Sequence, residues 1–103
     1  MICRTWRATT TRSLAPRYIA IAREKVLAEL RRVPGFRGCV LLGRAESDTE
    51  LLFLTFWESM DAVRAFAGPD PGRAVVLPEA EAVLTRCDHA AQHWEVEIHE
   101  PIG

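Results

Sequence analysis

The chain has 103 residues, of which 49% are hydrophobic and 26% charged, and its formal net charge is −1. This length predicts one domain, residues 1–103, and the near-neutral charge excludes the basic footprint of nucleic-acid-binding domains. No apolar run approaches the length that crosses a membrane. Three scattered cysteines without a CxxC pair indicate reduced thiols, so we expect a cytoplasmic location.

The first two predicted elements are a strand and a long helix. Residues 2–9 (ICRTWRAT) alternate and are rich in β-branched and aromatic side chains, which predicts a strand. Ser13 is the expected N-cap of a helix over residues 14–32, where apolar residues recur within an arc of about 120°. Tyr18 lies on this apolar stripe. A helix with one apolar side is expected to lie on a sheet.

A hairpin of two strands is predicted next. Residues 36–44 form its first strand, in which Gly38 and Gly43 indicate a bulge or a close backbone approach, and residues 46–49 form its turn. The second strand, residues 51–57 (LLFLTFW), is apolar on both faces, so both faces should be covered. Helices can cover one face. In so short a chain, a second subunit is the expected cover of the other.

The last part of the chain predicts a capped helix and a final strand. Ser59 is the expected N-cap of a helix that ends at Gly68, which is followed by proline. Residues 74–86 predict a short helical excursion, and residues 91–99 the last strand. The order β-α-β-β-α-β predicts a ferredoxin-like α+β fold, with an antiparallel sheet and both helices on one face.

Four motifs in this order resemble a known family. They are PGFRG at 34–38, FWESMDAVRAFAG at 56–68, PEAEAVL at 78–84 and HWEV at 93–96. Together they resemble the antibiotic biosynthesis monooxygenase (ABM) domain, a dimeric α/β-barrel family, and the resemblance covers nearly the whole chain. It implies a homodimer in which two sheets meet face to face, with a pocket in each subunit between the sheet and the helices.

The resemblance implies two kinds of activity. Some members oxidise polyphenolic aromatic intermediates without a metal or flavin. Others degrade haem, which they bind through a helix histidine, using an asparagine and a tryptophan. This chain has no asparagine, and its histidines, His89, His93 and His99, lie at or in the last predicted strand. The axial ligand of a haem degrader therefore has no counterpart on the expected helix.

The function implied is thus a cofactor-independent monooxygenase of a small aromatic or polyphenolic substrate, with no cofactor and no metal site. The alternative is a non-enzymatic dimeric module of the same fold that binds or senses a small molecule. An enclosed apolar cavity with a polar group from Arg4, Arg7, Tyr18 or His93 would favour the oxygenase. An interior filled by side chains would favour the alternative.

Two residues are predicted to be catalytic and four to bind substrate. His93 titrates in a range in which it can take a phenolic proton, and Trp57, which matches a family tryptophan, can form a pocket wall. Each has a structural alternative, a polar strand position for His93 and a core aromatic for Trp57. The predicted substrate-binding residues, each with a core or salt-bridge alternative, are Arg4, Arg7, Tyr18 and Phe66.

Overall fold

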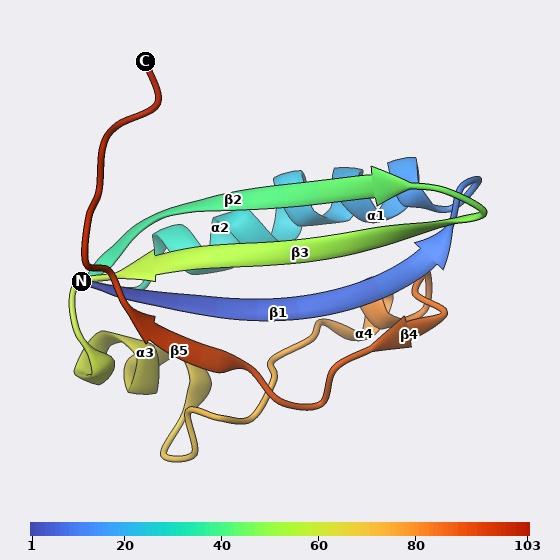
Figure 1. Ribbon diagram of the computed structural model, residues 1–103. Helices are drawn as coiled ribbons and strands as arrows, with labels where there is room; N and C mark the ends of the chain where they lie inside the picture. Colours follow the sequence, from blue (N-terminus) through green and yellow to red (C-terminus); the bar gives the residue numbers. More distant parts are fainter.

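The computed structural model describes all residues, 1–103, and its strands form one antiparallel sheet (Figure 1). The elements are β1 (Ile2–Thr11), α1 (Ala15–Ile21), the π-helical η1 (Ala22–Val26), α2 (Leu27–Arg31), β2 (Phe36–Ala45), β3 (Asp48–Trp57), α3 (Met60–Ala67), α4 (Pro78–Glu81), β4 (Arg86–Cys87) and β5 (Gln92–Glu95). The strand order is β2-β3-β1, and β4 and β5 both pair with the free side of β1. This confirms the predicted ferredoxin-like α+β fold.

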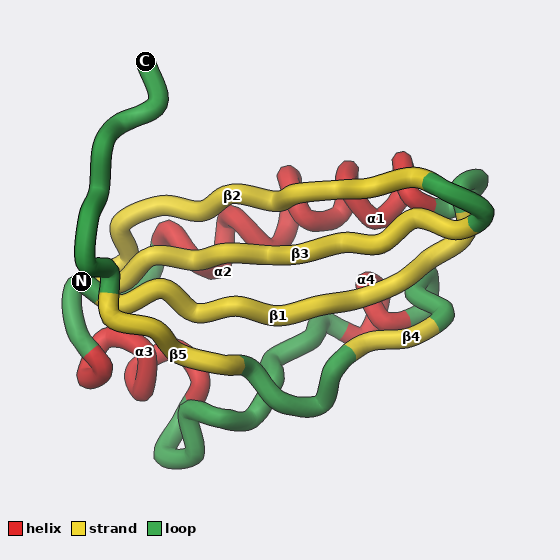
Figure 2. The backbone as a smooth tube through the Cα atoms, viewed as in Figure 1, coloured by secondary structure: helices red, strands yellow, loops and turns green.

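The helices cover one face of the sheet, as predicted (Figure 2). Alternate residues of β3, among them Leu51, Phe53 and Trp57, are buried against Leu30 of α2 and Val63 of α3 in a single hydrophobic cluster. Because residues of a strand alternate between faces, this cluster assigns both helices to the same side. The space between these helices and the sheet is where the site described below lies.

The long helix spans Ala15–Arg31 as a continuous run of α1, η1 and α2, close to its predicted bounds. The prediction of Ser13 as its N-cap is wrong. Leu14 occupies that position without a side-chain cap, and Thr11 Oγ1 instead accepts from the Leu14 N–H at 3.1 Å. The π-helical turn in the middle places the Leu27 N–H on the carbonyl of Ala22. Such turns widen a helix locally and are common near functional sites.

Two predicted backbone features are confirmed in the next two elements. The register of β2 against β3 shifts between Phe36 and Gly38, where Gly38 has a φ of +146°, so the bulge lies at the first of the two glycines, while Gly43 pairs regularly with Leu51. Ser59 Oγ accepts from the Ala62 N–H at 3.3 Å and caps α3. Gly35 is also required here, because an added Cβ would lie 2.6 Å from the Cβ of Ala62.

The last two predicted elements are shorter than expected. Only Pro78–Glu81 of residues 74–86 is helical, because Thr85 already pairs with β1 through its N–H on the carbonyl of Thr9, at 2.9 Å. The last strand ends at Glu95 instead of residue 99. Glu95 lies opposite Ile2, the first residue of β1, so the chain beyond it has no strand left to pair with.

Candidate functional site

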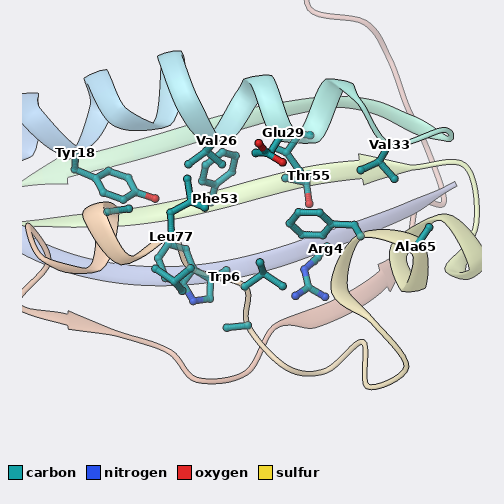
Figure 3. A pocket seen from close by; sticks show the side chains of 16 residues that line it. Arg4, Trp6, Tyr18, Val26, Glu29, Val33, Phe53, Thr55, Ala65 and Leu77 are labelled. Atoms are coloured by element: carbon teal, nitrogen blue, oxygen red, sulfur yellow. The ribbon is translucent and has the colours of Figure 1, made fainter.

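A cavity of about 340 Å³ lies between the helices and the sheet (Figure 3). Thirteen of its 16 lining residues are hydrophobic. The lining comes from β1, the long helix and the turn after it, β3, α3, the segment 74–77 and α4. The polar side chains in the lining are Arg4, Glu29 and Thr55, and Tyr18 adds its hydroxyl. A largely apolar cavity of this size with a few polar groups is typical of a small-molecule site.

Arg4 of β1 fixes the loop that closes one end of the cavity. The side chain is buried, and its Nη1 donates to the carbonyl of Pro71 and, at 2.9 Å, to His93 Nε2. Its Nη2 donates to the carbonyl of Arg73 at 2.7 Å, and its Cζ lies 5.8 Å from the ring centroid of Phe66. These acceptors and the ring offset the desolvation of the guanidinium. Burial still lowers the pKa of Arg4.

His93 of β5 lies behind Arg4 and is not part of the cavity lining. Because a guanidinium can only donate, Nε2 of His93 must be the unprotonated nitrogen in their contact. Burial, and secondly the positive charge of Arg4, lower the pKa of His93. Both effects keep the ring neutral, so that it accepts a hydrogen bond from Arg4 and holds the guanidinium in place.

Tyr18 of α1 brings a free hydroxyl to the other end of the cavity (Figure 3). The residue is only 2% exposed, and its hydroxyl has no hydrogen-bond partner within the chain. Every fully buried side-chain N or O atom of the protein does have such a partner, so the Tyr18 hydroxyl oxygen is not itself fully enclosed. The hydroxyl therefore meets open space inside the cavity. Burial, with a smaller contribution from Cys87, raises the pKa of Tyr18 to about 12, so the group is a neutral phenol that can donate.

Trp57 and Phe66 form one aromatic unit, of which only Phe66 lines the cavity. Trp57 is fully buried, its Nε1 donates to Thr55 Oγ1 at 2.8 Å, and its ring stacks on Phe66 with centroids 5.3 Å apart. Thr55 and Phe66 in turn line the cavity beside Arg4. Trp57 thus orients two lining residues from outside the cavity.

The comparisons with known proteins fit this architecture. The family model for antibiotic biosynthesis monooxygenase matches residues 1–76. This chain belongs to the antibiotic biosynthesis monooxygenase family. No curated protein sequence matches it significantly.

Several solved structures share its fold. The haem degrader MhuD of Mycobacterium tuberculosis is 20% identical with a TM-score of 0.68, over 98% of this chain and 100% of that chain. The monooxygenase ActVA-Orf6 of Streptomyces coelicolor, solved with nanaomycin D, is 17% identical with a TM-score of 0.65, over 99% and 92%. The cofactor-independent oxygenase SnoaB of Streptomyces nogalater is 23% identical with a TM-score of 0.62, over 98% of each chain.

The cavity of this ABM protein does not fit a haem, which some of its structural neighbours bind. Protein ligands of haem iron are His, Cys, Met or Tyr side chains, and Tyr18 is the one residue of these types in the lining. Iron binds tyrosine as tyrosinate, and a pKa of about 12 disfavours that form. His93 is outside the lining, with Nε2 engaged by Arg4. No group of three or more His, Cys, Asp or Glu side chains comes together as a metal site, either.

The structure separates the two arginines of β1. Arg4 points to the helices, and Arg7, exposed, lies outside the cavity beside the segment between β4 and β5. The alternation of a strand requires this, because the two residues are an odd number of positions apart. Of the six predicted site residues, the lining brings together Arg4, Tyr18 and Phe66; His93 and Trp57 touch this group from behind.

Two polar lining residues, Glu29 and Thr55, were missed by sequence reasoning. Glu29 had a detectable signal, because it lies three residues after Val26 and four before Val33, on the apolar stripe of the long helix. A carboxylate at such a position departs from the pattern of a core-facing stripe. Thr55 was visible as the one polar residue of the strand 51–57.

No helix of the protein is both long and apolar enough to cross a membrane.

Proposed function

We propose that this chain is a cofactor-independent monooxygenase that oxidises a small aromatic, polyphenolic substrate in the cavity between the sheet and the helices. The observation that carries the proposal is the Tyr18 hydroxyl, which has no partner within the chain and points into a largely apolar cavity. A cavity that was only a packing defect would have no reason to leave a buried phenol without a partner. The fold that it shares with SnoaB and ActVA-Orf6 supports the same class of reaction.

The proposed reaction needs few functional groups from the protein. An electron-rich phenol in its keto form carries an activated ring CH₂ group, which together with O₂ gives a C=O group and one water, so no further reductant is needed. The largely apolar walls pack against the ring of the substrate and reduce its contact with water. The Tyr18 hydroxyl donates to an oxygen atom of the substrate and stabilises negative charge that develops there.

We assign His93 and Trp57 to positioning within this mechanism. For His93 to take a proton from the substrate, its Nε2 would first have to leave Arg4, with which it lies in contact at 2.9 Å. Its hydrogen bond instead fixes Arg4, and Arg4 fixes the loop at Pro71 and Arg73. Trp57 orients Phe66 by stacking. Both residues then affect turnover through groups that line the cavity.

We propose further that two copies pair through the sheet face that the helices leave free. Leu52, Leu54 and Phe56 of β3 point to that face and are only half-buried, while Leu42 and Trp94 beside them are 49% and 57% exposed. An exposed apolar patch of this kind favours association. The three free cysteines support a reducing, cytoplasmic location for such a dimer.

The proposal is tested by oxygen uptake and product analysis with a panel of polycyclic phenols. Turnover of at least one phenol is expected, and Tyr18→Phe should lower it about tenfold while leaving the fold intact, because one hydrogen bond to developing charge is lost. Ser47→Ala, which removes an exposed hydroxyl from the β2–β3 turn, is the matched control. Binding of these phenols without any oxygen uptake would overturn the proposal in favour of a non-enzymatic binding module.

A further inference from the structure

Glu29 is the one carboxylate in the cavity lining, and it comes from the long helix (Figure 3). Val26 and Leu30 line the cavity beside it from the same helix, and Val33 lines it from the turn that follows the helix. A charged side chain that interrupts such an apolar face is unfavourable unless water or a ligand solvates it. Glu29 is exposed, so water solvates its carboxylate at the place where the cavity opens to the outside.

The Glu29 carboxylate is not used inside the protein. It is absent from all five ion pairs of the chain and from the hydrogen bonds between side chains. The lysine four residues before it, Lys25, is engaged by Glu79 of α4 at 2.5 Å. Arg4 is the cation in the lining, and its Nη atoms donate to the carbonyls of Pro71 and Arg73 and to Nε2 of His93.

We infer that Glu29 selects the ligand of this cavity, by accepting a hydrogen bond from a ligand hydroxyl or amine and by repelling a ligand carboxylate. The inference rests on the proposed function, because it needs the cavity to bind an aromatic ligand. A carboxylate is a much weaker base than a phenolate, so Glu29 takes the hydrogen bond and leaves the proton on the ligand. Tyr18, at the other end, supplies a donor. The cavity thus fits a ring system with a donor group at the Glu29 end and an oxygen acceptor at the Tyr18 end.

The test uses three naphthalene probes and isothermal titration calorimetry. 2-Naphthol has the donor, 2-methoxynaphthalene lacks it, and 2-naphthoate carries the repelled charge. We expect the wild-type protein to bind 2-naphthol about tenfold more tightly than the methyl ether, as one hydrogen bond to a charged group allows, and to bind 2-naphthoate most weakly. Glu29→Gln should reduce the naphthol preference severalfold and strengthen naphthoate binding.

Glu24→Gln is the matched control, because it removes the same charge from an exposed position of the same helix outside the lining. It should leave all the affinity ratios unchanged, and circular dichroism should show that both variants fold. Ratios that stay the same in Glu29→Gln would overturn this inference but leave the proposed function in place. If none of the three probes binds the folded wild-type protein, the inference and the cavity's assignment as an aromatic site both fall.

Discussion

The two faces of β3 carry similar side chains but have different surroundings. On the helix side, Leu51, Phe53 and Trp57 are 2%, 7% and 0% exposed. On the other side, Leu52 and Leu54 are only partly buried, although the strand is just as apolar there. The helices of one chain therefore suffice to bury one face only. The inner face serves both the core and the cavity, and the outer face is the one that we propose pairs with a second copy.

The buried polar groups follow the same division. Arg4 and Thr55, which lie opposite each other on β1 and β3, face the helices, and both make hydrogen bonds within the chain. Arg7 is exposed. The inner face can hold a guanidinium because the loop around Pro71 turns its carbonyls inward to meet it. A polar group is tolerated where the fold supplies its partners, and this is what separates the site from the rest of the core.

The comparison is tested most strongly by Trp57→Ala. Removing a fully buried indole from the inner face should lower the free energy of unfolding by about 3–5 kcal/mol, because a large cavity remains. Equilibrium urea denaturation measures this. The control is Trp94→Ala, which removes the same ring from the outer face and should cost much less in dilute protein. Equal losses at low protein concentration would contradict the division between the faces.

Arg4→Leu should have the next largest effect, a loss of about 2–4 kcal/mol in the free energy of unfolding. The carbonyls of Pro71 and Arg73 lose their donors, and buried acceptors without partners are costly. Arg7→Leu, the matched change on the exposed side of the same strand, should stay within about 0.5 kcal/mol. Chemical denaturation of both variants measures the two losses in the free energy of unfolding. If Arg7→Leu proved the more damaging, the loop would not depend on the inner arginine.

Leu54→Lys addresses the outer face directly. A charge in the centre of the proposed dimer contact should weaken association by about 2 kcal/mol, a roughly 30-fold higher dissociation constant, without unfolding the chain. Sedimentation velocity across a concentration series measures it. Ser47→Lys adds the same charge at the β2–β3 turn and should leave association unchanged. A wild-type protein that remains monomeric at micromolar concentration would contradict the proposed dimer.

The smallest expected effect is a pH dependence through His93. Its pKa in the folded state is lowered from 6.5, so the unfolded chain binds more protons between pH 6.5 and the folded value. Stability should therefore fall as the pH drops below 6.5, since a protonated ring can no longer accept from Arg4. Denaturation curves between pH 5 and 8 should show this slope in the wild type and a flatter one in His93→Gln. The same slope in both would assign it to another group.

Local sequence patterns were sufficient for the elements and their order. The alternation of residues 2–9, the apolar stripe on residues 14–32, the cap at Ser59 and the two-sided strand 51–57 each correspond to a helix or strand in the structure. These signals are local, because strand and helix periods are set by neighbours within a few residues. Apart from the N-cap at Ser13, the failures lie where partners are distant. The last strand stops at Glu95 because β1 begins at Ile2.

The sequence by itself determined the antiparallel βαββαβ arrangement and indicated that Tyr18, Phe66 and Arg4 were candidates for a pocket. Only the tertiary structure decided how they are used. Arg4 donates to the carbonyls of Pro71 and Arg73, 67 and 69 residues away, and these hydrogen bonds fix the loop in place. The same packing left Tyr18 without a partner and Glu29 in the cavity wall. No periodicity encodes such contacts, because they arise only when separate elements are brought together in space.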